Sequence, residues 1–280
     1  MSGKRLVVAV VSDLHCGSTV GLHPPEETPL DDGGAYTPSK AQGWLWSHWL
    51  AYWKRVREVA KWAELHVILN GDAVDGDHHG TTQIVSRHPG TQIEILKMCW
   101  LPVLEATRIK SLAVVRGTEV HVGPNGSAEE SFARWIAGRG ITVPRDPATK
   151  THSQWHFKGD YGGVVVDATH HGRMGGRPWT KLSGVGTLAA QIVMEYAQDR
   201  QQPPDLALRS HYHQVTDTHN AFPTRVIQTP AWQLATSFVH RIAPESLADV
   251  GGVIVSIAGG TYDVETYVAR PARTPTWKAG

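Results

Sequence analysis

Short apolar segments of this chain run directly into clusters of aspartate and histidine, and this order constrains the fold more than any other feature. The segments at residues 5–12, 65–69 and 111–116 are almost continuously apolar and rich in β-branched residues, as is typical of strands buried on both faces of a sheet. Parallel strands of this kind end at one edge of the sheet, so we expect the clusters that follow them to meet. In chain order the five clusters are Ser12-Asp13-Leu14-His15, Gly71-Asp72-Ala73-Val74-Asp75, Gly117-Thr118-Glu119-Val120-His121, His170-His171-Gly172 and Ser210-His211-Tyr212-His213. Carboxylates and imidazoles gathered at one edge are suited to a pair of divalent cations, because a carboxylate can bridge two ions.

The rest of the pattern predicts an α/β protein with two packed sheets. Further strands are expected at residues 151–157, 163–168, 206–208, 224–229, 252–257 and 261–269, and helices at 39–64, 91–106, 127–137 and 182–200. We expect Thr37 or Ser39 to cap the first helix and Ser127, with Glu130 three residues on, to form a capping box in the third. Strands that alternate with helices early and cluster later favour a double β-sheet sandwich flanked by helices, as a single domain over residues 1–280.

Composition excludes several classes of protein. The chain has 280 residues, 41% of them hydrophobic, which is enough for a substantial core and unlike a disordered segment. Its formal net charge of +1 gives no overall basic field for nucleic acid. Cys16 and Cys99 lack the spacing of a metal site or disulfide framework, so a reducing, cytoplasmic setting is expected. No apolar stretch approaches the roughly 20 residues of a membrane span, so we expect no membrane partner.

The five clusters, taken in order, resemble the motifs of the calcineurin-like metallophosphoesterase superfamily, which includes phosphatases, phosphodiesterases and nucleases. The family pattern is Asp-x-His, Gly-Asp-x-x-Asp, Gly-Asn-His followed by Glu or Asp, a His near Gly, and Gly-His-x-His. The resemblance spans residues 13–213 and implies a four-layer α-β-β-α fold with two divalent metal ions. The implied metal ligands are Asp13, His15 and His213 for one ion, Asp72 between the two ions, and His211 with one of His170 and His171 for the second.

One of these implied ligands leaves a choice between two residues, and the role of Asp75 is also open. We prefer His171 as the ligand because the family histidine often directly precedes a glycine, here Gly172. His170 stays open, since neighbours on a strand point to opposite faces. Asp75 is expected to orient a ligand imidazole by accepting its other N–H, although a turn or cap role for this carboxylate is also open.

The third cluster departs from the family pattern. Thr118 and Glu119 stand where the family has Asn and His, and the next histidine is His121. A hydroxyl is a poorer metal ligand than an amide oxygen, so we expect Glu119, in preference to Thr118, to bind the second ion. We expect His121 to protonate the leaving oxygen, which makes His121 and the bridging Asp72 the catalytic residues.

The substrate is expected to be a phosphoester, and more specifically a phosphodiester of nucleic acid or a nucleotide. Two cations about 3.5–4 Å apart would supply the attacking hydroxide and neutralise phosphoryl charge. Mn²⁺ is expected, with Fe, Zn²⁺ and Mg²⁺ as alternatives. Arg116 and Arg173 are candidates for contacting the phosphate, Trp179 could stack on a base, and His78 and His79 could line the cleft. A phosphatase and a catalytically impaired binding or scaffold module are the alternatives, and the sequence does not fix the oligomeric state.

Overall fold

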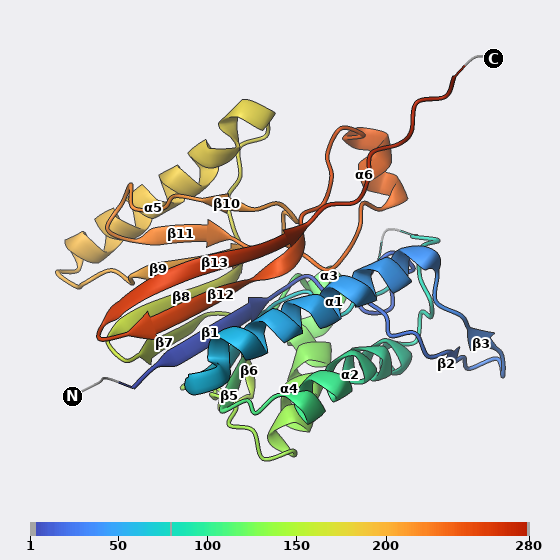
Figure 1. The fold of residues 1–280 in the computed structure, drawn as a ribbon, viewed down its shortest axis with the longest axis horizontal. Coiled ribbons are helices and arrows are strands. Elements are labelled where there is room, and N and C mark those ends of the chain that lie inside the picture. Colours follow the sequence, from blue (N-terminus) through green and yellow to red (C-terminus); the bar gives the residue numbers. More distant parts are fainter. Residues whose placement is uncertain (1–3, 79, 279–280) are drawn as a thin grey trace.

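The computed structural model describes residues 4–78 and 80–278, which form two sheets with helices on their outer faces (Figure 1). The first sheet has six strands in the order β13-β12-β1-β4-β5-β6. Their bounds are β13 Thr261–Ala269, β12 Val250–Ala258, β1 Leu6–Val11, β4 Glu64–Asn70, β5 Ser111–Val115 and β6 Ser153–Gln154. Strands β1, β4, β5 and β6 are parallel, whereas β12 and β13 run antiparallel to their neighbours.

The second sheet has five strands in the order β10-β11-β9-β8-β7. Their bounds are β10 Thr216–Asp217, β11 Arg225–Gln228, β9 Leu206–Ser210, β8 Val164–His171 and β7 Phe157–Tyr161. The central strands β8, β9 and β11 are parallel, so they deliver their carboxyl ends to the same edge. A separate two-stranded hairpin, β2 Thr28–Pro29 with β3 Ala35–Tyr36, lies between β1 and the first helix.

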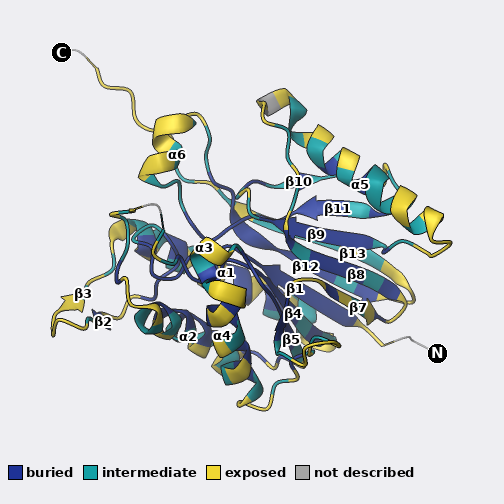
Figure 2. Cartoon of the chain, turned by 180° about the vertical axis from the view of Figure 1, so that it is seen from behind, coloured by how far each residue is buried: buried dark blue, intermediate teal, exposed yellow. Residues whose placement is uncertain are grey.

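The alternation of side chains along β1 explains the layers. Val8 and Val10 pack with Val166 and Leu208 of the second sheet. The alternate residues Val7, Ala9 and Val11 face the helices. The helices on that outer face are α1 Lys40–Val59, α2 Pro89–Ala106 and α4 Ser127–Ala137. Helix α5, Lys181–Gln198, covers the other sheet through a small apolar cluster. The four layers confirm the predicted sandwich, and Figure 2 shows the strands as its most buried part.

Three local expectations are corrected by the structure. Helix α1 ends at Val59, five residues early, because β4 begins at Glu64; the short 3-10 turn η1, Ala60–Trp62, joins the two elements. Helix α4 is capped by Gly126, whose φ of 65° is left-handed, so Ser127 forms no capping box. The strand expected at residues 151–157 is divided between β6 and β7, because the chain passes there from one sheet to the other.

The remaining helical segments are short. They are α3 Glu119–Val122, η2 Pro124–Gly126, η3 Pro178–Thr180 and α6 Ser237–Ile242. Helix α6, which the sequence analysis did not predict, lies at the end of the molecule reached by the C-terminal segment (Figure 1). None of the helices in the described part of the chain is both long and apolar enough to cross a membrane.

Candidate metal centre

The five clusters meet where β1, β4, β5, β8 and β9 end, as the parallel strand pattern predicted. Five candidate ligands there have a left-handed backbone, with φ of 52° at Asp13, 44° at His15, 50° at Asp72, 79° at His211 and 54° at His213. This conformation is unfavourable for residues other than glycine and concentrates at functional sites. Backbone bonds between the loops hold it, including Asp13 N–H to the Gly71 carbonyl at 2.9 Å and His15 N–H to the Asp72 carbonyl at 3.0 Å.

Asp13, His15 and His213 form the first group of potential ligands, with ligand atoms that all lie within 4.8 Å of one another. His213 Nε2 is 3.3 Å from Asp13 Oδ1. The His15 ring is oriented by Asp75, whose Oδ1 accepts from His15 Nδ1 at 3.0 Å and from the Gln233 amide at 3.1 Å. This is the geometry that an orienting role for Asp75 requires, and it directs His15 Nε2 toward the group.

Asp72, His170 and His211 form the second group. The His170 ring donates from Nδ1 to the Asn70 carbonyl at 2.8 Å, which leaves Nε2 at 2.9 Å from Asp72 Oδ2. Asp72 also belongs to a third group with His15 and His121. It therefore lies between the two sets, where a bridging carboxylate has to be.

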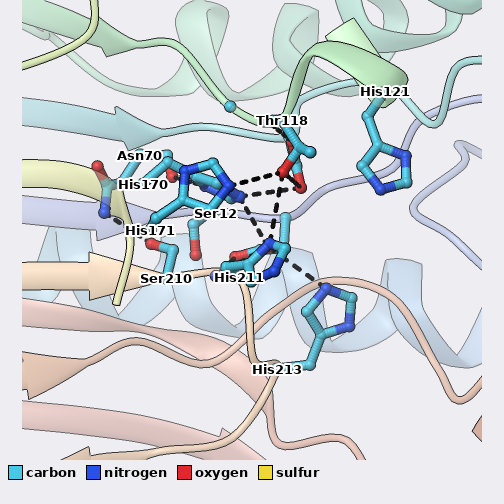
Figure 3. Close-up of polar contacts among 12 residues, drawn as sticks. Ser12, Asn70, Thr118, His121, His170, His171, Ser210, His211 and His213 are labelled. Carbon is cyan, nitrogen blue, oxygen red and sulfur yellow. Dashed lines mark hydrogen bonds and ion pairs between the residues drawn. The ribbon is translucent and has the colours of Figure 1, made fainter. Parts of the chain in front are cut away.

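The structure places both members of the adjacent histidine pair at the site. His170 is buried and meets Asp72 directly, whereas His171 is exposed, with its Nε2 3.4 Å from the Thr118 hydroxyl. Figure 3 shows His170, His171 and His211 gathered around Thr118, with His121 and His213 farther along the site. The geometry favours His170 over His171, the residue preferred because it precedes Gly172. The pairing of β8 with β9 shifts in register between Ala168 and His171, which the position of a glycine in the sequence does not show.

Thr118, and not Glu119, faces the second group. The Thr118 N–H donates to Asp72 Oδ1 at 2.6 Å, and its hydroxyl is 3.4 Å from His211 Nδ1. Glu119 is exposed and accepts from the Asn125 N–H at 3.3 Å. The metal role expected of Glu119 disagrees with this placement, because helix α3 begins at Glu119 and turns its side chain away from Asp72.

His121 lies beside the first group, and His78 adjoins it, with ring centroids 4.4 Å apart. His121 Nδ1 donates to the Asp75 carbonyl at 2.6 Å, so Nε2 is the atom free to exchange a proton. Burial and the nearby His15 lower the pKa of His121 to about 4. An anionic substrate beside the ring would raise that pKa and favour the protonated form that a general acid needs. His79 lies outside the described residues.

The charges at the centre are strongly coupled. Burial alone would raise the pKa of Asp72, but the adjacent His170 imidazole reverses the effect and holds that pKa well below its usual range. Burial opposes protonation of His170, yet Asp72 and Asp13 raise its pKa to about 10. Asp72 is therefore ionised at neutral pH, as a carboxylate that binds a metal must be, and an ion that binds His170 has to displace its second proton.

The donor set fits a pair of divalent cations. His15 Nε2 is buried, and among the described residues it has no hydrogen-bond partner, while His170 Nε2 is buried against Asp72 Oδ2. A buried polar nitrogen without a partner is costly unless something binds it. Mixed imidazole and carboxylate donors suit Mn²⁺, Fe and Zn²⁺.

Glu129 supports the site but was not identified from the sequence. Its carboxylate accepts from the Gly117 N–H at 2.8 Å and from the Ala73 N–H at 3.3 Å, so it joins the second and third motif loops. Burial and the charge of Asp72 raise the pKa of Glu129 to about 8. The signal that would indicate this role is the complete burial of an acidic side chain in an amphipathic helix. The sequence alone does not show that Glu129 is buried.

The two predicted phosphate-binding arginines lie elsewhere. Arg116 is buried and donates to the hydroxyls of Ser153 at 2.9 Å and Thr151 at 3.0 Å, so it joins the strand ends instead of facing the ligands. Arg173 is exposed in the loop after β8. Trp179 is 78% exposed, and neither it nor these arginines lines the cavity beside the metal ligands.

No family model and no curated protein matches the sequence. Solved structures that match this chain include a predicted phosphoesterase from Streptococcus pneumoniae, with 10% identity, coverage of 94% of this chain and 90% of that one, and a TM-score of 0.39. A dimetal phosphatase from Danio rerio has 9% identity, coverage of 94% and 99%, and a TM-score of 0.39. Vacuolar Protein Sorting 29 from Cryptosporidium parvum has 11% identity, coverage of 97% and 100%, and a TM-score of 0.39. At this similarity the matches carry no argument about function.

Proposed function

We propose that this chain is a dinuclear metal-dependent phosphoester hydrolase of the calcineurin-like type that prefers phosphodiesters. The observation that carries the proposal is the position of Asp72 between two groups of imidazoles and carboxylates, with His121 beside them. Two bound cations at such a centre supply Lewis-acid charge and a hydroxide nucleophile at neutral pH.

The side chains of this chain hold the cations and fix their orientation. Asp13, His15 and His213 would bind the first ion, and His170 with His211 would bind the second, with Asp72 shared. Asp75 keeps the His15 ring in the tautomer whose Nε2 faces the ion, since its carboxylate accepts the Nδ1 proton. Thr118 fixes Asp72 through its backbone N–H, so the shared carboxylate is oriented before any ion arrives.

His121 is the candidate general acid. Its Nδ1 is fixed by the Asp75 carbonyl, which leaves Nε2 to protonate the leaving oxygen as the phosphorus–oxygen bond breaks. The products are then an alcohol and a phosphomonoester, with water as the other reactant. An alkoxide leaves poorly without a proton, so this step matters most for alkyl esters.

The charges that line the cavity favour a diester over a monoester. The cavity beside the ligands has a volume of about 360 Å³, and none of the described residues that line it is a lysine or an arginine. Lysine and arginine side chains would stabilise a bound monoester dianion more than a bound diester monoanion. Their absence from this lining supports the less charged substrate and gives no support to a long nucleic-acid strand.

A second candidate is a metal-stabilised binding module. It is favoured by Thr118, whose hydroxyl lies 3.3 Å from Asp72 Oδ2 where the family pattern has an asparagine. A weaker second ligand set would slow turnover and leave the fold intact.

The test compares hydrolysis of bis-p-nitrophenyl phosphate and p-nitrophenyl phosphate by the purified chain with Mn²⁺, using Asp72→Asn as the blank. Faster hydrolysis of the diester is expected. Preference for the monoester would instead indicate a phosphatase. No turnover above the blank with Mn²⁺, Fe²⁺ or Zn²⁺ would contradict the hydrolase and favour the binding module.

A further inference from the structure

The cavity beside the metal ligands has two unlike sides. One side carries the imidazoles and carboxylates of the centre. The rest of its lining comes largely from the segment that includes helix α6 and is mostly apolar and otherwise uncharged. Its apolar lining residues are Leu234, Ala235, Phe238, Val239 and Ala248.

Both ends of this apolar wall are bonded to the loops that carry the ligands. At the start of the segment, the Trp232 N–H donates to the Asp13 carbonyl at 2.9 Å. At its end, the Asp249 N–H donates to the His213 carbonyl at 2.9 Å. Gln233 reaches Asp75 at 3.1 Å from the same segment. The wall is therefore held in a fixed position relative to the metal centre and forms part of the same site.

Aromatic surface is exposed at this wall. Phe238 is 56% exposed and Tyr212, between the two ligands of the last motif, is 38% exposed. A single exposed aromatic residue needs no explanation, but two lining one cavity next to a catalytic centre provide a face for an apolar or aromatic group. Arg241 lies outside the cavity lining, with its guanidinium carbon 5.6 Å from the Phe238 ring.

The polar groups on this side are neutral. Gln214 and Ser246 hydrogen-bond each other at the cavity wall, and Thr236 caps helix α6 by accepting from the Val239 N–H at 3.3 Å. In the neighbouring cavity Arg87 is paired with Asp77 at 2.7 Å. Among the described residues that line the cavity, those of the metal centre are therefore the ones that can meet phosphate charge, and the wall suits a part of the substrate that carries no charge.

We infer that this cavity is the subsite for an uncharged aromatic or apolar group esterified to the phosphate, which makes the substrate a small phosphodiester with one such substituent. The inference rests on the proposed function, since the phosphate itself has to bind at the metal centre. The whole cavity, its metal-centre side included, has a volume of about 360 Å³, which lies at the lower end of the range for small-molecule sites and suits a phosphate with one small substituent. Phe238 and Val239 are the residues that would select the group.

The test uses two phosphonates as inhibitors of bis-p-nitrophenyl phosphate hydrolysis by the Mn²⁺-loaded protein. Phenylphosphonate and methylphosphonate present the same dianion to the metals and differ only in the apolar group. We expect phenylphosphonate to inhibit about tenfold more strongly, because the ring removes more apolar surface from water. In Phe238→Ala this ratio should fall to about threefold or less.

The controls separate the subsite from the reaction. Trp62, 78% exposed in η1 just before β4, is an aromatic residue outside the cavity, so Trp62→Ala should keep the wild-type ratio. Equal inhibition by both phosphonates, or an unchanged ratio in Phe238→Ala, would overturn the subsite and leave the hydrolase standing. Absence of any turnover by the wild type would overturn both.

Discussion

The two ends of the β-sandwich are built differently although the same strands run between them. At the metal centre, turns that need a left-handed backbone use Asp13, Asp72 and His211. At the opposite end, the turn between β7 and β8 uses Gly162 and Gly163, and the β12–β13 turn uses two further glycines. Glycine adopts this conformation without strain, whereas Asp and His do so only when the surroundings enforce it. Backbone strain is therefore present at the metal centre, where the side chains of several loops must converge.

The volume of a cavity does not show which end of the sandwich holds the metal centre. The cavity at the opposite end is larger, about 830 Å³ against about 360 Å³, and is lined by Lys4, His66 and Lys110 among others. Glu64 at this cavity is paired with Lys4 at 2.9 Å and with His66 at 3.2 Å. Convergent ionised groups, and not volume, identify the functional end.

The largest contrast between the ends is expected for single carboxylate replacements. Asp72→Asn should abolish phosphodiester hydrolysis, a loss of about 10³-fold or more, because a neutral amide cannot bridge two cations. Glu64→Gln at the opposite end is the matched control and should keep wild-type activity. Measurable turnover in Asp72→Asn equal to that of Glu64→Gln would remove the functional distinction between the ends.

His121→Ala should have a large effect that depends on the leaving group. Hydrolysis of an alkyl phosphodiester should slow by about 10²–10⁴-fold, whereas a p-nitrophenyl ester should slow far less because its leaving group needs no proton. The check is kcat for both esters with the same variant. Equal losses on the two esters would refute the general-acid role.

Asp75→Asn should weaken metal binding by about 10–100-fold, because the His15 ring would lose its charged orienting partner. Asp77, two residues away and paired with Arg87 at the surface, offers a matched control in Asp77→Asn. Metal affinity measured by competition with a chelating dye distinguishes the two. Loss of affinity in Asp77→Asn alone would show that the orienting carboxylate has been misassigned.

A smaller effect is expected where sequence and geometry disagree. Thr118→Val should lower affinity for the second metal by roughly tenfold or less, since its backbone N–H to Asp72 remains. Glu119→Gln should bind both ions as the wild type does, because that side chain is exposed and turned toward Asn125. The same chelator competition decides, and a loss confined to Glu119→Gln would restore the original preference.

The smallest effect is a pH dependence of stability at the opposite end. Burial lowers the pKa of His66 below 6.5, so the unfolded chain binds a proton more readily than the folded chain. The stabilisation is present above pH 6.5 and is lost as the pH falls from 6.5 through the folded pKa. Urea unfolding of wild type and His66→Gln across this window should give a steeper pH dependence for the wild type, with unchanged activity; parallel curves would contradict the assignment.

The sequence predicted the architecture because apolar strand patterns and clusters of metal-binding residue types are both local signals. Apolar strands running into Asp and His clusters indicated which strand ends meet, and the sandwich was confirmed. What could not be predicted depends on contacts between distant segments. Cys16 and Cys99 are 83 residues apart in the sequence, yet their sulfur atoms lie 4.0 Å apart in the core. Likewise, nothing local indicates that Glu129 accepts two backbone N–H groups from other loops.

Helix direction explains the remaining disagreement at the site. The family pattern favours a residue after Gly117 as a ligand, and charge favoured Glu119 over Thr118. Helix α3 begins at Glu119, so the preceding Thr118 is the residue directed at Asp72. A four-residue helix has too little periodicity to be predicted from sequence.

The most direct test of a two-cation centre at this end of the sandwich is the metal content of the protein after loading with Mn²⁺ and gel filtration, measured by inductively coupled plasma mass spectrometry. Two ions per chain are expected for the wild type and for Glu64→Gln, and one or none for Asp72→Asn. The same metal content in all three proteins would contradict the account, because the carboxylate shared by the two ligand groups would then not be needed to hold the ions.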